Sequence, residues 1–428
     1  MINKKINRLL SSILGVALTI GITEMPVWAN DSVQATSAYS TNTNLIEDKS
    51  YVVNKDNSVE QNGVNVRINK IVGTKHKLKV TVLVKSEKTL DETNNGNIMA
   101  QLTYGEENHG SERTSYDNID KNTLKITFET NTRDDEEFAE KGQLRVDLVM
   151  QKYKVNVGID ADVDFTESFK NTIEKDISEK IPDSDSTLKK VEVSNLGTEI
   201  TCLEPKIDFS NRENSIASRQ STMILKVGDK MYKTRHSGSH TSGKSKNDNM
   251  STSTYEAEAV NYDMVNDQKD ISIIPISCNM TWGEVENINK TFINNKGNKE
   301  NNVNKETINN VTYEKSFEFS NGNKGEIYNI ERNDNSIKVY CRGTSEKEGL
   351  MMASNIRMNY HIEKGKIDGS SYYDGNNNIS FYKDSKNALG YVVEFNNVEK
   401  DKAVDLNLDY MIKQIDRYKV GEEIKISK

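Results

Sequence analysis

Proline, cysteine and tryptophan are scarce in this sequence. Its 428 residues include only 4 prolines, 3 cysteines and 2 tryptophans. So few prolines, beside 24 glycines, leave little room for proline-rich or collagen-like spacers. The cysteines, Cys202, Cys278 and Cys341, have no paired spacing such as C-x-x-C, and their odd number fits a secreted chain that does not depend on disulfides. A Cys202–Cys278 bridge stays open, but buried free thiols are the favoured interpretation.

Apolar residues are also few. They make up 34% of the chain and aromatic residues 7%, with a mean hydropathy of -0.74. This composition cannot fill one deep core, but it suits thin two-layer sandwiches, in which each strand buries every second side chain. The length allows about two to four domains. The net charge of -8 gives no attraction for phosphate, so we expect no nucleic-acid partner.

The one long apolar run lies near the N-terminus. Three basic residues within the first eight positions precede the run Leu9–Ile22, and small or permissive residues follow at 27–29. This pattern predicts a signal peptide over residues 1–29, cleaved after Ala29, and therefore a secreted or surface protein. Membrane contact is expected only if the run is retained as an anchor, although it is shorter than the roughly 20 residues of a spanning helix. Residues 30–50, rich in Ser, Thr and Asn, predict a flexible lead-in.

Alternating apolar and polar residues indicate the strands of the mature chain. Val64–Ile68 and Leu78–Val84 alternate on either side of a short polar break, which is the pattern of an antiparallel hairpin with one buried face. Similar runs follow at Ile98–Tyr104, Leu124–Phe128 and Leu144–Met150. About six strands at this spacing predict an antiparallel sandwich over residues 51–155.

Residues 156–186 are expected to connect this first sandwich to a second. Apolar residues from Ile159 to Phe165 alternate with three aspartates, which predicts an edge strand with an acidic outer row. Further apolar residues then recur every four positions: Phe169, Ile173, Ile177 and Ile181. That spacing predicts a short helix, ended by Pro182.

Two more sandwich modules are predicted, over residues 187–286 and 309–428, joined by an Asn- and Lys-rich linker at 287–308. In the second module Gly228-Asp229 predicts a hairpin turn and His236–Ser253 a long polar loop. The strands expected in the third are Gly325–Asn329, Ile337–Cys341, Asn355–Ile362, Ile379–Tyr382, Tyr391–Phe395, Ala403–Tyr410 and Glu423–Ile426. The predicted fold class is therefore all-β, with tandem antiparallel β-sandwiches.

Possible metal ligands are few and poorly spaced. His236 and His240 are four residues apart, but they stand in the predicted loop, so we interpret them as solvated histidines. Asp160-x-Asp162-x-Asp164 is similar to the start of a calcium loop, but the required glycine and glutamate are missing, so a solvated strand face is favoured. The Asp-Gly-Asn run at 374–378 is primarily a turn former.

No catalytic motif stands out either. The nucleophile elbow, the P-loop and the dinucleotide-binding glycine pattern are all absent from the sequence. Some aromatic residues allow a binding platform, although core filling is the favoured interpretation: Trp282, Tyr360, Tyr372, Tyr373 and Tyr382. We therefore assign no catalytic, cofactor-binding or metal-binding residue, and we expect a non-enzymatic protein without a cofactor.

The opening hairpin resembles a known family. Gln61-Asn-Gly-Val-x-Val-x-Ile-x-Lys-Ile-Val, a short gap and Leu-x-Val-x-Val-x-Val are similar to the start of the bacterial domain of unknown function 4179. The third module resembles its companion, domain of unknown function 5643, at Ile337–Tyr340, Ile356–Ile362, Gly390–Phe395 and Val404–Leu408. The resemblance implies extracytoplasmic, Ig-like sandwiches of Firmicutes, which are Gram-positive, often linked to anti-sigma-type regulation. It brings no catalytic residues.

These observations predict a secreted or surface-associated binding or sensory module, part of an extracytoplasmic regulatory system, whose partner is an unknown protein or cell-envelope ligand. A cell-wall polymer hydrolase is the alternative and would need a cleft with paired carboxylates. A β-pore-forming toxin is a further alternative, suggested by the Ser/Thr-rich run Ser237–Thr254. Its hairpin would have to alternate over about ten positions per strand, and Lys244–Met250 does not.

Overall fold

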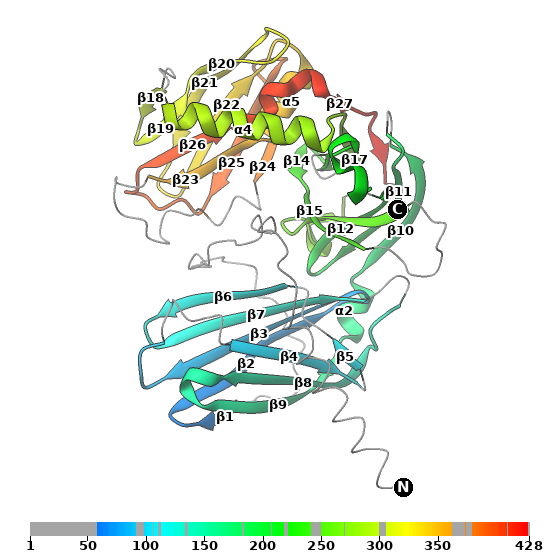
Figure 1. Cartoon of the computed structure of the whole chain (residues 1–428), viewed down its shortest axis with the longest axis vertical. Helices are drawn as coiled ribbons and strands as arrows, with labels where there is room; N and C mark the ends of the chain where they lie inside the picture. Colours follow the sequence, from blue (N-terminus) through cyan, green and yellow to red (C-terminus); the bar gives the residue numbers. More distant parts are fainter. Residues whose placement is uncertain are drawn as a thin grey trace. The chain divides into compact units, whose positions relative to one another are not determined.

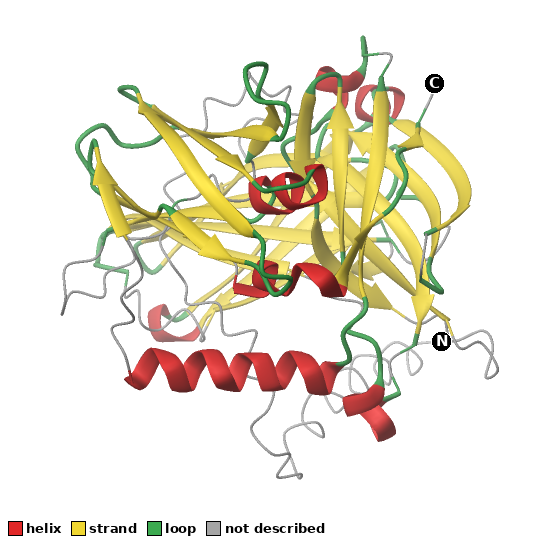
Figure 2. Cartoon of the chain, turned by 90° about the horizontal axis from the view of Figure 1, so that it is seen from above, coloured by secondary structure: helices red, strands yellow, loops and turns green. Residues whose placement is uncertain are grey.

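The computed structural model of this chain describes residues 58–426 except 91–97, 106, 110–112, 133–135, 182–183, 207, 218–220, 241–249, 269, 299–304, 362–372, 374–378 and 409. Strands dominate these residues and helices are few (Figure 2), which confirms the predicted all-β sandwich class. The predicted signal peptide, the lead-in and the turn at 374–378 lie outside the described residues. Among those described, no helix is long and apolar enough to cross a membrane.

The first sandwich consists of two antiparallel sheets (Figure 1). One sheet has the order β1 (Ser58–Gln61), β2 (Val64–Gly73), β3 (Lys77–Ser86), β7 (Thr123–Asn131) and β6 (Arg113–Asp120). The other has the order β5 (Glu107–His109), β4 (Ile98–Tyr104), β8 (Lys141–Met150) and β9 (Val155–Asp164). Alternate residues of these strands point inward and form one buried cluster. The predicted hairpin is confirmed as β2 and β3.

Strand β9 is the predicted edge strand with an acidic outer row. It pairs only with β8, and its apolar residues are buried while Asp160 and Asp162 are exposed. Asp160 forms an ion pair of 3.1 Å with Arg145, and Asp164 one of 2.8 Å with Lys141. The interpretation of these aspartates as a solvated strand face is confirmed.

The helix predicted from Phe169 to Ile181 is wrong beyond Lys170. Helix α2 spans Thr166–Lys170, and strand β10 follows at Ile173–Lys180. A spacing of four residues keeps side chains on one face of a helix, but it does the same in a strand, because four is a multiple of the strand period of two. Ile177 accordingly belongs to strand β10, and its side chain is buried.

A ten-stranded sheet runs through the predicted second and third modules. Its order is β20 (Ser316–Glu318), β21 (Lys324–Arg332), β22 (Ser336–Arg342), β25 (Gly390–Asn396), β24 (Ser380–Lys383), β14 (Lys230–Lys233), β13 (Thr222–Val227), β17 (Ile271–Cys278) and β27 (Tyr418–Val420), with β28 (Ile424–Lys425) paired to β17. The hairpin turn at Gly228-Asp229 is confirmed between β13 and β14. The pair β14–β24 joins the two modules, and the C-terminal strands return to β17.

Two smaller sheets cover opposite faces of this long sheet. One has the order β10, β11 (Thr187–Ser194), β12 (Gly197–Pro205), β16 (Met250–Ala257) and β15 (Arg235–His240). The other has the order β18 (Lys305–Ile308), β19 (Val311–Glu314), β26 (Val404–Leu408) and β23 (Ile356–Tyr360). Tyr232 belongs to the buried cluster of the first, whereas its neighbour Met231 belongs to that of the second. Successive strand residues point to opposite faces, so the two sheets pack on opposite sides.

The remaining segments depart from the predicted loops. Helix α4 (Trp282–Asn298) covers the first part of the predicted linker at 287–308. Strands β15 and β16 occupy the two ends of the predicted loop His236–Ser253, and residues 241–249 between them are not among the described residues. Helix α5 (Glu346–Ala353) is buried on the long sheet. The other helical segments are α3 (Tyr262–Val265) and the 3-10 turns η2 (Gln151–Tyr153), η3 (Phe209–Asn214) and η7 (Tyr410–Arg417).

All three cysteines are buried free thiols, as favoured from the sequence. Cys202 lies in the core beneath the five-stranded sheet, and Cys278 and Cys341 lie in the cluster of the four-stranded sheet. Burial raises the pKa of the Cys202 and Cys341 thiols, so both act as small apolar side chains.

Candidate ligand-binding cleft

A cleft of about 830 Å³ opens where β14 and β24 meet. These strands form only two pairs, Met231 with Phe381 and Tyr232 with Ser380. The next pair in register, Lys230 and Tyr382, is not formed. Continuous sheet hydrogen bonding ends at this point, so side chains from both halves of the long sheet can line the opening.

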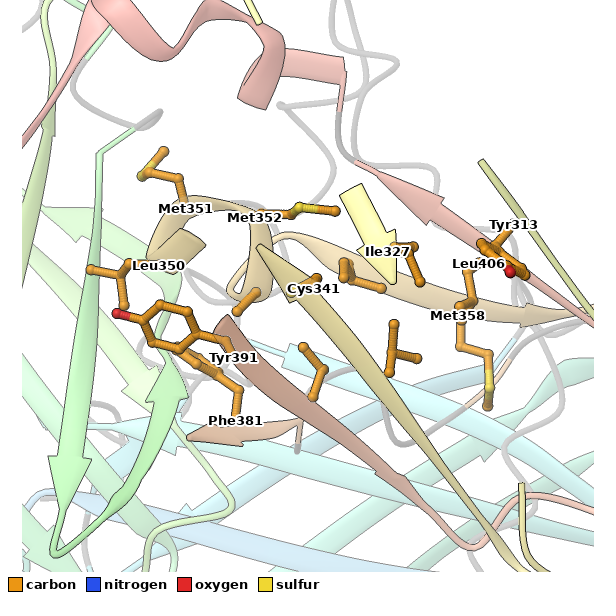
Figure 3. Close-up of a cluster of buried hydrophobic side chains, with 14 of the residues drawn as sticks. Tyr313, Ile327, Cys341, Leu350, Met351, Met352, Met358, Phe381, Tyr391 and Leu406 are labelled. Carbon is orange, nitrogen blue, oxygen red and sulfur yellow. The ribbon is translucent and has the colours of Figure 1, made fainter. Parts of the chain in front are cut away.

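Apolar and aromatic side chains make up much of the lining. The apolar residues come from five elements: Met231, Ile274, Leu350, Val392 and Val420. Three tyrosines join them, Tyr340 from β22, Tyr382 from β24 and Tyr391 from β25. Leu350 of α5 lies beside the Tyr391 ring at the edge of the buried cluster (Figure 3). A preformed apolar lining with a few polar groups is the usual composition of a ligand site.

Charged side chains complete the lining, and two ion pairs form among them. Lys226 forms an ion pair of 3.2 Å with Glu423, and Lys383 forms one with Glu346. The Lys383 ammonium also lies 4.7 Å from the centre of the Tyr391 ring. Because Lys226 and Lys383 are each matched by a carboxylate, these two pairs add no strong net charge to the cleft.

Lys347 adds a partly dehydrated ammonium to the cleft. It stands in the first turn of α5 and donates a hydrogen bond to the backbone carbonyl of Tyr418. Burial lowers its pKa, against the opposing influence of Asp416 and Glu348. An ammonium that has already lost part of its hydration can donate to a ligand at a smaller desolvation cost.

The pKa of one carboxylate of the cleft, Glu423, is shifted downward. The pKa of Glu423 is lowered by hydrogen bonds from Ser272 and Lys226, although partial burial opposes this. A general acid for glycoside cleavage needs the opposite shift, since it must hold a proton near neutral pH. The shift of Glu423 is therefore opposite to the one that a general acid needs.

A second polar group ties the two halves together beside the cleft. Glu394 of β25 lies 3.0 Å from Lys230 of β14 and 3.2 Å from Lys338 of β22, and it accepts a hydrogen bond of 3.2 Å from Tyr382. Burial raises the pKa of Glu394, but the two lysines outweigh this and the pKa is lowered. The Lys230–Glu394 pair therefore spans the gap where the strands cease to pair.

The predicted aromatic platform is only partly assembled. Tyr382 lines the cleft, whereas Tyr360 and Tyr373 are buried against each other in the core with ring centroids 6.2 Å apart. Trp282 packs beneath the Arg212 guanidinium at 4.9 Å, and Tyr372 lies outside the described residues. Core filling is confirmed for Tyr360 and Tyr373. Tyr340 and Tyr391 were missed, although the alternation of their strands could have placed them.

None of the histidines whose side chains the structure describes lines this cleft. His236 stands in β15, not in a loop as predicted, with its ring edge-on to Tyr255 at 5.3 Å and its Nε2 2.9 Å from the Ser239 hydroxyl. His240 is in the same strand. His361 forms an exposed pair of 2.9 Å with Asp405. The interpretation of His236 and His240 as loop residues is therefore wrong.

A separate polar cluster contains His76, Glu174 and Glu192, whose nearest donor atoms lie within 4.8 Å of one another. The Lys190 ammonium lies 3.0 Å from His76 Nε2 and 3.0 Å from a Glu174 oxygen. A cation of the chain itself thus occupies this position, and we assign no metal to it. No local pattern predicts this cluster, because His76 lies in the turn between β2 and β3 whereas Glu174 and Glu192 lie on β10 and β11.

No family model matches the chain, and no curated protein matches it. Among solved structures, the chain is similar to one described as the crystal structure of the conserved domain protein from Bacillus anthracis, at 17% sequence identity and a TM-score of 0.39. The similarity covers 54% of this chain and 80% of that chain. It is too weak to support an argument about function. The resemblance to domains of unknown function 4179 and 5643 stays a prediction.

Proposed function

We propose that this protein is a secreted or surface-associated, non-enzymatic binding module whose ligand occupies the cleft between β14 and β24. The ligand would be a cell-envelope component or another protein. The observation that carries the proposal is the lining itself, in which apolar, aromatic and paired charged side chains from both halves of one sheet surround a volume of about 830 Å³.

The chemistry of the lining favours a polar ligand with flat apolar faces. Half-buried Tyr340 and Tyr382 offer ring faces together with hydroxyl groups, a combination that suits sites where one end is apolar and the other wet. The Lys226–Glu423 and Lys383–Glu346 pairs supply donors and acceptors in about equal number. Sugar chains of the envelope have this mixed character.

The position of the cleft also supports a sensory role. Its walls come from two halves of the sheet, which meet at the two residue pairs of β14 and β24 and at the Lys230–Glu394 ion pair. A ligand that contacts both walls would stabilise one relative placement of the halves, because it binds that placement more tightly than others. The resemblance to extracytoplasmic regulatory domains agrees with this role.

The proposal is tested by sedimentation of the exported chain with purified Gram-positive cell-wall sacculi. We expect wild-type protein to bind and Tyr382→Ala to bind about tenfold more weakly, because loss of a central aromatic contact typically has this effect. Tyr262→Ala, on half-buried Tyr262 of α3 outside the cleft, is the matched control and should bind like wild type. Equal binding by Tyr382→Ala and wild type would contradict the assignment of the cleft.

The same preparation separates the proposal from the hydrolase alternative. A binding module leaves the sacculi intact, so no soluble reducing ends should appear during prolonged incubation. Their release at a rate above that of buffer alone would favour the hydrolase. Permeabilisation of dye-loaded liposomes would favour the pore-forming alternative.

A further inference from the structure

Four glutamates form a row across the five-stranded sheet. The strand register places Glu174 opposite Glu192, Glu192 opposite Glu199, and Glu199 opposite Glu256. Residues directly opposite each other on neighbouring strands share a face, with Cβ atoms about 5 Å apart, and like charges in such positions repel. This glutamate row therefore needs cations or protons to be stable.

The first sandwich supplies most of the cations that face the row. Lys75, in the turn between β2 and β3, lies 2.8 Å from Glu174, and Lys77 at the start of β3 lies 2.7 Å from Glu256. Arg113 of β6 lies 3.6 Å from the same Glu256. The contact between the first sandwich and the five-stranded sheet is thus an ionic one.

His76 completes the contact at the centre of the turn. Its Nδ1 lies 2.9 Å from the backbone carbonyl of Glu136, and its Nε2 lies 3.0 Å from the Lys190 ammonium. The same Nε2 lies 3.5 Å from a Glu192 carboxylate oxygen. The ammonium of Lys190 also lies 3.6 Å from Glu192, so it is shared among three partners.

Further charged groups surround the row, and all belong to the same network. Those from the first sandwich are Lys75, His76, Lys77, Lys79, Arg113, Glu129 and Glu137, and those from the five-stranded sheet and its flank are Lys190, Arg235 and Glu258. Counted with the row itself, seven carboxylates face six lysine and arginine side chains. The carboxylates exceed the lysine and arginine side chains by one, so the network has no surplus of positive charge to stabilise every glutamate as an anion.

Two members of the row have raised pKa values. Burial raises the pKa of Glu192 to about 7, with the charge of Glu174 acting in the same direction against Lys190. Burial also raises the pKa of Glu199 to about 7. The charges of Glu192 and Glu256 raise this pKa further, whereas Lys77 lowers it. In contrast, the pKa of Glu129 falls to about 2, because Lys79 and Lys77 outweigh its burial.

We propose that the contact between the glutamate row and the first sandwich is a proton-controlled joint, closed at mildly acidic pH and loosened above neutral pH. Three observations carry it: the row of like charges, the burial of Glu192 and Glu256 within the row, and the ion pairs that the first sandwich forms with Glu174 and Glu256. The joint lies on a different sheet from the cleft and does not depend on the ligand.

The direction follows from which state binds more protons. Glu192 and Glu199 hold protons in the closed joint that they release when the joint opens. Their contribution to the stability of the closed joint is therefore complete below the ordinary glutamate pKa of 4.5, and it is lost as the pH rises through about 7. Glu129, Glu174 and Glu256 have lowered pKa values and act in the opposite sense, since their ion pairs are lost as the pH falls below 4.5. The joint is therefore tightest between these limits.

Amide hydrogen exchange of the full chain tests the joint. After correction for the intrinsic pH dependence of exchange, the turn at 74–77 should exchange roughly tenfold faster at about pH 8.5 than at about pH 6, because two glutamates near pKa 7 lose their protons. In Glu192→Gln/Glu199→Gln, whose amides mimic the protonated carboxyls, the rate should not change between these pH values. The control Glu306→Gln removes a carboxylate from the distant pair with Lys315 and should keep the wild-type dependence.

Two results would overturn the proposal. One is a wild-type turn that exchanges equally at both pH values, and the other is a double variant that keeps the full pH dependence. Should the double variant not fold, Glu199→Gln alone is the second test, because it replaces only the central carboxylate of the row. This variant should remove about half of the change in the logarithm of the exchange rate between the two pH values. An unaltered change would equally contradict the proposal.

Discussion

At the scale of single residues, Glu348 holds the helix that borders the cleft. Its side chain is only 2% exposed, and it accepts hydrogen bonds from Asn323 at 2.7 Å and from the Thr344 hydroxyl at 2.6 Å. Its own backbone N–H donates to the Ser345 hydroxyl, the N-cap of α5. The Glu348 carboxylate also accepts from the backbone N–H of Thr344, so both residues before the helix hold its first turn, from which Lys347 reaches the cleft. Burial raises the pKa of Glu348, but these hydrogen bonds outweigh it and lower the pKa to about 2.

Glu348→Ala is expected to lower the free energy of unfolding by about 1–3 kcal/mol, because buried donors lose their acceptor. The contribution of a carboxyl with a lowered pKa is present above the ordinary value of 4.5 and disappears as the pH falls toward about 2, so the difference from wild type should shrink in acid. Urea denaturation of both proteins at several pH values measures this difference in the free energy of unfolding. Glu346→Ala, on an exposed side chain of the same turn, is the control and should have little effect.

At the scale of elements, the β11–β12 hairpin brings two glutamates of the row together. Gly197 closes this hairpin with a φ of +115°, a conformation that side chains rarely adopt. A Cβ at this position would lie 2.8 Å from the Cα of Glu258, which is backbone and cannot move aside easily. The register that places Glu192 opposite Glu199 depends on this turn.

Gly197→Ala should therefore destabilise the protein by about 2–4 kcal/mol, combining backbone strain with a clash. Gly105 provides a matched control, because its φ of +63° is also positive but no atom lies within 4 Å of the added Cβ. Gly105→Ala should lose only about 1 kcal/mol. Thermal denaturation of both variants measures the difference, and equal losses would show that the close contact with Glu258 does not matter.

At the scale of the whole molecule, the predicted second and third modules share their largest sheet. The β14–β24 pair connects them, and one buried cluster contains Met231 of one and Phe381 of the other. A shared core couples the stability of its parts, so both regions should unfold together. The first sandwich has a separate buried cluster, which includes Phe128.

Phe381→Ala is expected to destabilise the shared core by about 3–5 kcal/mol. Native-state hydrogen exchange should then accelerate in β13 and β17 as well as in β22 and β25, while β2 and β3 keep their protection. Phe128→Ala, an equally buried residue of the first sandwich, should produce the reverse pattern. Acceleration confined to β22 and β25 in Phe381→Ala would indicate two independent modules.

Local sequence patterns determined the strands and their buried faces. The alternation of Val64, Val66 and Ile68 required a half-buried strand wherever the chain folded, because side chains of a strand point to opposite faces in turn. The same property led to the wrong helix at Ile173–Ile181, since a spacing of four fits both a strand and a helix.

Tertiary structure alone decided which strands became neighbours. Lys230 and Glu394 are separated by 164 positions, and nothing local to either residue indicates that they meet beside the cleft. The glutamate row likewise depends on the pairing of four strands and on Lys77, which arrives from another sandwich. Pairing between distant strands is selected by the packing of the whole core, so alternation in the sequence determined the sandwiches, and the folded sheets determined the cleft and the row.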